Sequence, residues 1–313
     1  MAKLTWGTRA RLFPRVLYGT CLAMLAVGGA VPPSPAEAGA VLDRIVERKA
    51  IRFGYRTDAP PFSSVVDGRP QGYSVDLCGR VAAAILKASD LQELTGTFTP
   101  VAAEGRFDAL AEGRIDVLCG PTTATLSRRE QVSFTIPVFA TGVGAMLAAD
   151  APAALADPLM DALPGSLPDD AIPDALSGRR LGIRAGTTAE SWLAAGEGEA
   201  LGDAEIVSFD DHAAGVAAVV AGEIDVYFAD QAILLGILAR SEDVDRLQVS
   251  PATYTVEPYA LAIPRGDEEL RLVLDRALSL LFRKRAFEPL YERYFGPLTL
   301  QAQLFYRVAA LPE

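Results

Sequence analysis

The chain has 313 residues, half of them hydrophobic, with 29 Lys and Arg against 40 Asp and Glu and a formal net charge of −11. This acidic balance argues against binding to nucleic acid or to an anionic membrane surface. The length suffices for one large or two ordinary domains. The single histidine and the absence of paired-cysteine spacing argue against a metal site, and we expect no cofactor.

Residues 1–38 have the pattern of a secretory signal peptide. Basic residues precede an apolar run over 16–31, and Ala36-Glu37-Ala38 before Gly39 is a small-x-small cleavage signature. The apolar run is short and ends in two prolines, which favours a cleaved signal over a membrane span. A retained N-terminal anchor is the alternative.

Two cysteines, Cys78 and Cys119, remain after removal of this segment. An even number in an oxidising compartment favours a disulfide, which would close a loop of about 40 residues. Two buried thiols are the alternative.

Strand and helix patterns alternate along the first half of the chain. We expect a strand at 51–55, a helix at 74–88, a short helix at 106–112, a strand at 115–119 and a strand at 138–147. Such alternation predicts an α/β fold with parallel sheets flanked by helices.

Residues 149–178 differ in composition, because alanine, proline and aspartate dominate them. We interpret them as a linker-like surface insertion, partly disordered. The α/β pattern then resumes with strands at 180–184, 205–209 and 224–228, helices from 188, at 212–221 and at 231–240, and a closing amphipathic helix at 267–282.

Two segments, 106–116 and 216–225, resemble each other. Each reads as a helix followed by glycine, charged residues and Ile-Asp before a strand. This repetition indicates two similar α/β lobes. Since ligands of open α/β sheets bind beyond the carboxyl ends of strands, we expect a cleft where the loops after 119, 183 and 228 converge.

The segment 120–134 carries the strongest chemical signal. It follows a strand and is expected to open a helix, so that hydroxyls, free amides and Arg128 would favour an anion at a helix N-terminus. Thr123 could add a donor, and an exposed helix arginine is the alternative. Asp230 follows a buried-looking strand, where it could bind an ammonium group or simply cap a helix.

Four further positions have both a functional and a structural interpretation. Thr187 and Thr188 lie in a capping box that ends at Glu190, Arg56 follows a strand, Arg106 begins a helix, and His212 is the single histidine.

These residues together resemble the bacterial family 3 extracellular solute-binding proteins, the amino-acid receptors of ABC importers. The resemblance extends over about residues 45–296 and rests on the following motifs: Ile51-Arg-Phe-Gly-Tyr-Arg-Thr-Asp-Ala-Pro-Pro-Phe62, Gly72-Tyr-Ser-Val-Asp-Leu-Cys78, Ile115-Asp-Val-Leu-Cys-Gly-Pro-Thr-Thr123 with Arg128, Ala185-Gly-Thr-Thr188, Ile224-Asp-Val-Tyr-Phe-Ala-Asp230 and Glu257-Pro-Tyr-Ala-Leu-Ala-Ile263.

The resemblance implies a two-lobe, type II periplasmic-binding-protein fold, in which each lobe is a mostly parallel sheet flanked by helices and the chain crosses twice between lobes. Lobe 1 would be discontinuous, at 39–141 and 254–313, and lobe 2 would be 142–253 with the insertion at about 149–178.

The resemblance also assigns roles to residues at the ligand backbone. The arginine matching Arg128 holds the α-carboxylate, with a further contact from Thr123. The acid matching Asp230 holds the α-ammonium, and the residue at Pro121 offers its carbonyl to the same group.

The specificity that the resemblance implies is for glutamate or aspartate. Arg56, Arg106 and His212 match positions that face the ligand side chain, and several cationic groups there would favour a carboxylate. Cys78 and Cys119 match a cysteine pair of the same subgroup.

The resemblance therefore predicts a non-enzymatic, periplasmic and monomeric receptor that delivers a polar amino acid to an ABC permease in the inner membrane. Two alternatives share the fold: an exported cyclohexadienyl or arogenate-type dehydratase, with His212 or Glu104 as general acid, and a sensor input module.

Overall fold

The structure is a computed structural model that describes residues 40–161, 171–196, 203–284 and 287–313. The predicted signal peptide lies outside the described residues and stays a prediction. Within these ranges, no helix has the length and hydrophobicity needed to cross a bilayer.

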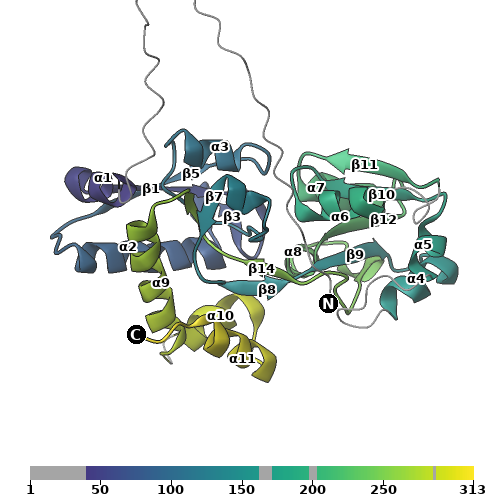
Figure 1. Ribbon diagram of the computed structural model, residues 1–313. Helices are drawn as coiled ribbons and strands as arrows, with labels where there is room; N and C mark the ends of the chain where they lie inside the picture. Colours follow the sequence, from purple (N-terminus) through teal and green to yellow (C-terminus); the bar gives the residue numbers. More distant parts are fainter. Residues whose placement is uncertain (1–39, 162–170, 197–202, 285–286) are drawn as a thin grey trace, which may run out of the picture. The chain divides into compact units, whose positions relative to one another are not determined.

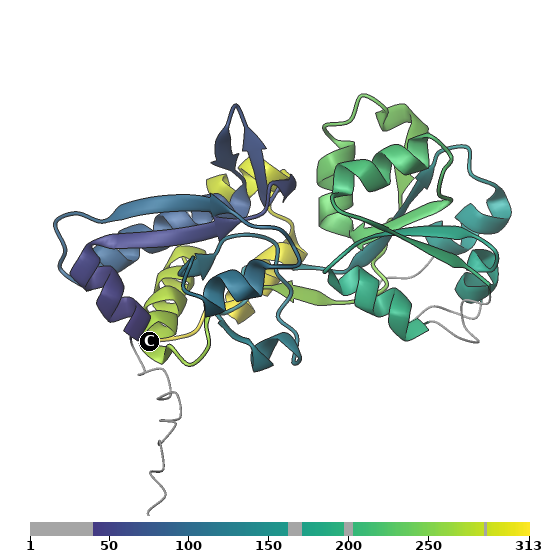
Figure 2. The same cartoon turned by 90° about the horizontal axis from the view of Figure 1, so that it is seen from above.

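The first lobe is built on a five-stranded sheet. Its order is β5 (Thr95–Pro100), β1 (Ala50–Tyr55), β6 (Val117–Leu118), β15 (Ala262–Pro264) and β7 (Val132–Phe134). Its helices are α1 (Ala40–Arg48), α2 (Tyr73–Ala88), α3 (Arg106–Ala111), α9 (Glu268–Phe282) and α10 (Glu288–Phe295). A separate antiparallel sheet contains β2 (Asp58–Ala59), β3 (Ser63–Val66) and β4 (Arg69–Gln71), seen from above in Figure 2.

The second lobe repeats this plan. Its strand order is β11 (Glu205–Phe209), β10 (Arg180–Arg184), β12 (Val226–Asp230), β9 (Val143–Ala148) and β13 (Leu247–Val249). Its helices include α6 (Thr188–Gly196), α7 (His212–Val220) and α8 (Gln231–Leu238). The lobe thus has the same sheet size as the first, with its own set of helices.

The chain crosses between the lobes twice, and the two crossing strands pair with each other. Strands β8 (Phe139–Thr141) and β14 (Glu257–Tyr259) form an antiparallel ribbon, visible side by side in Figure 1. Each crossing leads into an antiparallel strand, β9 or β15, so both sheets are mixed. The expected parallel pairing holds around β1 and β10, where strands alternate with helices. The exact lobe boundaries at 141/142 and 253/254 stay a prediction.

The repeated Ile-Asp segment has the same structural role in both lobes. Asp116 donates its backbone N–H to the carbonyl of Arg52, and its Oδ2 accepts the Arg52 N–H at 2.9 Å. Asp225 makes the same two bonds to Arg180, with the second at 2.8 Å. Each aspartate therefore satisfies backbone groups near the start of a central strand.

A glycine ends the helix before each of these aspartates. Gly113 and Gly222 have φ of 65° and 69°, in the left-handed region that glycine adopts without strain. Their amides donate to Leu110 and Val219, respectively, in the last helical turn. The similarity between the two sequence segments thus reflects the same local structure in each lobe: a glycine ends a helix, and an aspartate then fixes the start of a strand.

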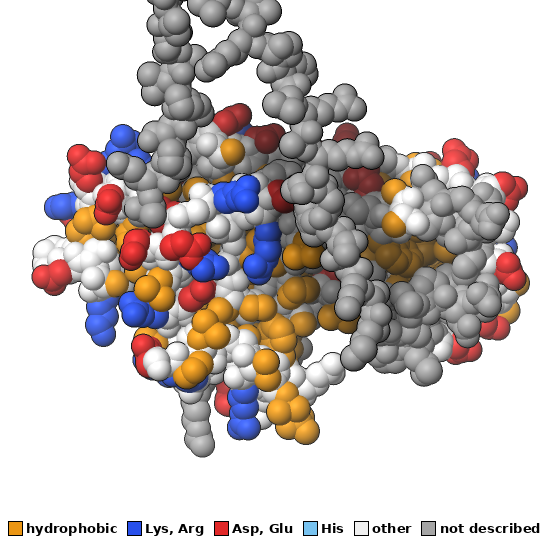
Figure 3. Space-filling view, viewed as in Figure 1, with side chains coloured by type: hydrophobic (Ala, Val, Ile, Leu, Met, Phe, Trp, Pro, Cys, Tyr) orange, Lys and Arg blue, Asp and Glu red, His pale blue; other side chains and the backbone are white. Residues whose placement is uncertain are grey.

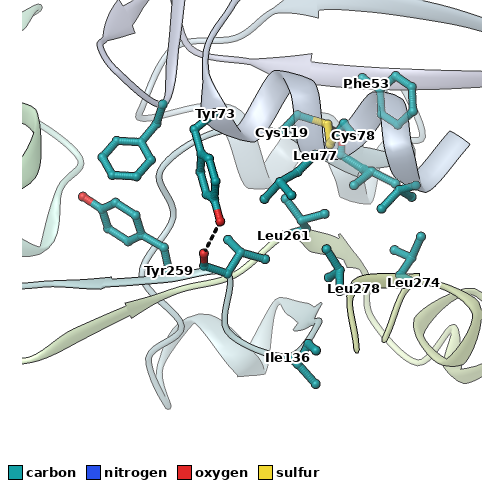
Figure 4. Packing of buried hydrophobic residues seen from close by; sticks show 14 of the residues in the cluster. Phe53, Tyr73, Leu77, Cys78, Cys119, Ile136, Tyr259, Leu261, Leu274 and Leu278 are labelled. Atoms are coloured by element: carbon teal, nitrogen blue, oxygen red, sulfur yellow. Dashed lines mark hydrogen bonds between the residues drawn. A yellow bond between two sulfur atoms is a disulfide. The ribbon is translucent and has the colours of Figure 1, made fainter. Parts of the chain in front are cut away.

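The core of the first lobe joins segments that are distant in the sequence (Figure 4). Cys78 of α2 is disulfide-bonded to Cys119 after β6, which confirms the predicted pair. Tyr73, fully buried at the start of α2, donates its hydroxyl to the Val138 carbonyl at 2.8 Å. Covalent and polar links thus hold α2 to the sheet and to the segment before the first crossing.

The interpretation of 149–178 as a linker-like insertion was wrong for its described part. This part includes helices α4 (Ala153–Met160) and α5 (Ala171–Leu176). Leu155 and Leu159 of α4 and Leu176 of α5 are buried in the second-lobe core. Apolar side chains at helical spacing explain this packing, and the bias toward alanine and proline concealed them.

The chain ends in helix α11 (Leu300–Ala309), which has two different faces. Tyr306 is buried and donates its hydroxyl to the Val138 carbonyl at 3.1 Å. Leu300 and Val308 on the other face are exposed, and hydrophobic side chains gather over this part of the first lobe in Figure 3. The last helix thus extends the core of the first lobe.

Replacing both cysteines by serine should lower the free energy of unfolding by about 4 kcal/mol, because the disulfide closes a loop with a sequence separation of 41 residues. Denaturant unfolding of the oxidised protein and of the double variant measures this difference. Reductant should destabilise the parent chain and leave the double variant unchanged. Equal stability of the two proteins would contradict the expectation.

Candidate functional site

The segment after β6 does not form the expected helix, so the prediction of an anion at a helix N-terminus was wrong. Residues 120–127 are irregular, and Arg128–Glu130 is a single 3-10 turn before β7. The Thr125 hydroxyl accepts the Arg128 backbone N–H at 3.1 Å, as a helix N-cap would, but only this short turn follows. Any anion here must be held by side chains and loop amides.

Glu257, on the second crossing strand β14, is the centre of a buried polar cluster. Its Oε2 accepts the hydroxyls of Thr123 and Thr188, each at 2.6 Å, and its Oε1 accepts the hydroxyl of Thr255 at 3.0 Å. Thr123 follows β6 in the first lobe, and Thr188 begins α6 in the second. One carboxylate on the crossing strand thus contacts both lobes. We call these four residues the Glu257 cluster.

Asp230, at the end of β12, is a carboxylate without a full set of partners. It occupies the N-cap position of α8, yet its side chain makes no capping hydrogen bond. Its Oδ1 is shielded from solvent and lacks a hydrogen-bond partner among the described residues. Burial and the nearby Glu257 carboxylate raise the pKa of Asp230 to about 7. The alternative of a plain helix cap is therefore wrong.

Arg128 contributes the opposite charge beside these carboxylates. Its Nη1 donates to the Thr123 carbonyl at 3.0 Å, and its guanidinium lies 5.6 Å from the centre of the Phe107 ring. Burial lowers the pKa of Arg128, while the charges of Glu257 and Asp230 oppose that effect. Arg128, Thr123, Thr188 and Asp230 are thus gathered around Glu257, as a binding site for a zwitterion requires.

Arg56 is part of a second group of charges that includes partners the sequence analysis missed. Its Nε and Nη2 donate to the two oxygens of Asp58, each at 2.9 Å. Arg184, at the end of β10 in the second lobe, donates its Nε to Asp58 Oδ2 at 3.0 Å and its Nη1 to Glu104. We call Arg56, Asp58, Glu104 and Arg184 the arginine–aspartate cluster.

The two arginines of this cluster stabilise the ionised form of Asp58. Burial acts to raise the pKa of Asp58, but the charges and hydrogen bonds of Arg56 and Arg184 hold it well below its usual range. Asp58 therefore stays ionised near neutral pH.

Arg106 and His212 lie near the same cluster. Arg106 is buried, donates its Nη1 to the Gly186 carbonyl at 3.1 Å, and packs its guanidinium 4.5 Å from the Phe107 ring centre. Its Nε lacks a partner within the described part of the chain. Burial and the charges of Arg128 and Arg56 lower the pKa of Arg106, so a negative group is electrostatically favoured beside it.

His212 is neutral near pH 7, so its interpretation as a cationic group was wrong. The side chain is buried, and burial and the charge of Arg56 lower its pKa to about 3. Its Nδ1 is 2.9 Å from the Tyr227 hydroxyl. His212 can offer a hydrogen bond to a ligand, but not a charge.

Thr187 and Pro121 have weaker links to the site. The Thr187 hydroxyl donates to the Arg184 carbonyl at 2.7 Å, and Glu190 accepts the N–H of Gly186 at 2.9 Å rather than that of Thr187, so the reciprocal bonds of the expected capping box do not form. Gly186 has φ of 70°, and a Cβ there would lie 3.1 Å from the Glu104 nitrogen.

Pro121 is buried in the loop after β6. The role of its carbonyl as a hydrogen-bond acceptor for the ligand ammonium group stays a prediction.

One cavity formed by described residues borders the arginine–aspartate cluster. This cavity of about 310 Å³ is lined by residues that include Asp58, Arg184, Asp210 and Asp211. A larger cavity of about 410 Å³ lies between α2 and α10 and contains none of the clustered residues. The smaller cavity borders the arginine–aspartate cluster through Asp58 and Arg184, whereas Arg128, Asp230 and Glu257 do not line it. Among the described residues, no group of histidine, cysteine and carboxylate side chains could hold a metal ion.

The fold and the site define the class of this protein. Two α/β lobes joined by a paired crossing, with buried and opposite charges where their strands end, are the architecture of a type II periplasmic ligand-binding protein. The chain belongs to the bacterial extracellular solute-binding proteins, family 3, whose family model matches residues 51–297.

Similar proteins bind several amino acids. The L-glutamate/L-aspartate-binding protein of Pseudomonas aeruginosa is 28% identical over 91% of this chain and 88% of its own length. The L-cystine-binding protein TcyJ of Escherichia coli K12 is 23% identical over 92% of this chain and 97% of its own. The solved structure of the ancestral amino acid-binding protein AncCDT-1, a precursor of cyclohexadienyl dehydratase, has a TM-score of 0.66 at 25% identity and covers 81% of this chain and 99% of its own.

Replacing Asp230 by Asn should stabilise the protein in a pH-dependent manner. The folded state keeps the Asp230 proton up to about pH 7, whereas the unfolded state loses it near the ordinary value of 3.8. The free energy of unfolding of the parent chain therefore falls as pH rises between these values.

Asn does not ionise, so its advantage should be absent near pH 4 and reach on the order of 2–4 kcal/mol at pH 8. Denaturant unfolding of both proteins at several pH values measures this. An advantage that is the same at every pH would contradict the assignment of the shift to Asp230.

Proposed function

We propose that this protein is a periplasmic receptor that captures a polar L-amino acid, with glutamate and aspartate favoured, and delivers it to an ABC importer. The partner would be a permease in the inner membrane, which the loaded receptor approaches as a monomer. The predicted signal peptide and the family support an exported location.

The observation that carries the proposal is that Arg128 lies near the carboxylates of Glu257 and Asp230, whose charges oppose the lowering of its pKa by burial. A guanidinium can hold an α-carboxylate through two parallel hydrogen bonds. Asp230 has a buried oxygen without a partner among the described residues, which an α-ammonium group would satisfy. Opposite charges at one site select a zwitterion, and an amino-acid backbone is one.

The preference for an acidic side chain rests on two further observations. Arg56 and Arg106 are both buried, and the charges of Arg128 and Arg56 add to burial in lowering the pKa of Arg106. A carboxylate would relieve that repulsion. The similar protein of Pseudomonas aeruginosa that binds glutamate and aspartate supports the same preference.

The dehydratase alternative receives less support from the geometry. A general acid must carry a proton near the working pH. Burial opposes ionisation of Glu104, but its hydrogen bond to Arg184 lowers its pKa overall, and the pKa of His212 is lowered to about 3. Neither residue named for that role would hold a proton near neutral pH. Formation of an aromatic product from prephenate or arogenate would nevertheless overturn the receptor proposal.

The proposal is tested by calorimetric titration with the twenty amino acids, followed by the Arg128→Ala variant. The parent chain should bind one or a few polar amino acids, and Arg128→Ala should abolish that binding, because the variant leaves the ligand carboxylate without its partner. Arg129→Ala, at the neighbouring exposed arginine, is the matched control and should bind normally. Retained affinity in Arg128→Ala would disprove the role of Arg128 as the carboxylate clamp.

The assignment of the side-chain preference is tested separately by Arg56→Asp. This variant replaces an attractive charge by a repulsive one, so it should weaken glutamate far more than glutamine in the same titrations. Circular dichroism should first establish that the variant is folded. Equal losses for the two ligands would mean that Arg56 does not contact the ligand side chain.

A further inference from the structure

Asp58 occupies the hydrogen-bonding positions that the side chain of an acidic ligand would need. Its two oxygens receive both Nε and Nη2 of Arg56, the parallel arrangement that arginine also uses for a ligand carboxylate. Asp58 Oδ2 also accepts the Nε of Arg184. The carboxylate of this chain is therefore bound by one guanidinium from each lobe, in the manner expected for a glutamate or aspartate side chain.

The burial of these groups makes the arrangement important for binding. The side chains of Arg56 and Arg184 are each 4% exposed and that of Asp58 is 14% exposed, so water screens their interactions little. A buried charge pair is broken at high cost unless the new partner replaces every lost bond. A ligand carboxylate can therefore bind the Nε and Nη2 side of Arg56 only by displacing Asp58.

Neighbouring groups do not remove this competition. Glu104 is a second acid in the cluster and is bound to Arg184, while His212 is neutral near pH 7. Arg106 supplies a third arginine, and its buried Nε lacks a partner among the described residues. Two carboxylates thus already oppose three guanidinium groups before any ligand binds, and one net positive charge is left for a ligand side chain.

We propose that Asp58 is a specificity-determining residue, an internal carboxylate that competes with the ligand side chain for Arg56 and Arg184 and so reduces discrimination between acidic and amide amino acids. This inference rests on the proposed function, because it concerns the side-chain end of the same site. It predicts that the affinities for glutamate and glutamine differ less than they would if Arg56 and Arg106 acted without Asp58.

The test compares glutamate and glutamine, and then aspartate and asparagine, by calorimetry with the parent chain and with Asp58→Asn. The variant keeps the size of the side chain but removes the negative charge that holds the Nε and Nη2 groups of Arg56. The ratio of glutamate to glutamine affinity should rise by about tenfold or more. Asp58→Glu, which keeps the charge, should stay much closer to the ratio of the parent chain.

Asp210→Asn is the matched control, because Asp210 is exposed, lines the same cavity and gives the same change in net charge. It should leave the ratio unchanged. An equal rise in Asp210→Asn would mean that the net charge around the cavity, and not the contact of Asp58 with Arg56 and Arg184, sets the affinity ratio. This result would contradict the proposal. If Asp58→Asn does not fold, Asp58→Ser provides the same comparison with a small neutral side chain.

The outcomes separate this inference from the proposed function. A parent chain that binds no amino acid would disprove the receptor function, and the role of Asp58 with it. Amino-acid binding with the same glutamate-to-glutamine ratio in the parent chain, Asp58→Asn and Asp58→Ser would overturn the inference alone and leave the receptor function intact.

Discussion

Charged side chains that are withdrawn from water must be paired, hydrogen-bonded or neutralised, and this constraint organises the site of this protein. Asp58 meets it by binding Arg56 and Arg184. Glu257 meets it by accepting three threonine hydroxyls. Asp230 has an oxygen without a hydrogen-bond partner among the described residues, and burial together with the Glu257 carboxylate raises its pKa. The loops that connect strands and helices in both lobes are placed so that these pairings are possible.

The two lobes contribute to the site in equivalent ways because they are built in equivalent ways. In each lobe an Ile-Asp segment after a glycine-terminated helix fixes the start of a central strand, so that the opposite end of that sheet carries the polar loops. The crossing strand β14 then adds Glu257, which contacts a threonine from each lobe. The strand that connects the lobes covalently therefore also connects them through hydrogen bonds.

The sequence predicted the local features of this structure well and the distant pairings poorly. Helix α2, strands β1, β6, β10, β11 and β12 and the disulfide follow from periodicity and cysteine count, whereas strands β5, β7, β13 and β15 were not predicted. The partners of Glu257 and Arg184 have no such signal, since Thr123 lies 134 residues from Glu257 and Asp58 lies 126 residues from Arg184. The helix expected after residue 120 is only a 3-10 turn at Arg128–Glu130, although the Thr125 hydroxyl accepts the Arg128 amide as a helix cap would. Side chains that compete with the backbone for hydrogen bonds are visible in a sequence, but the outcome of that competition is not.

In the proposed receptor, binding and stability would be opposed at Asp230, because the feature that lowers stability is the one that the ligand would satisfy. A carboxylate that is buried beside another carboxylate costs free energy whenever both are ionised. An α-ammonium group would remove that cost and supply the missing hydrogen bond in one step. The free energy released in this way adds to the binding free energy. A site whose buried polar groups lack partners therefore binds a complementary ion more tightly than a site whose groups are already paired. Asp58 illustrates the opposite case, because a carboxylate that is already well paired leaves less to gain from a ligand. In the proposed receptor, Asp230 would thus set affinity at one end of the site and Asp58 selectivity at the other.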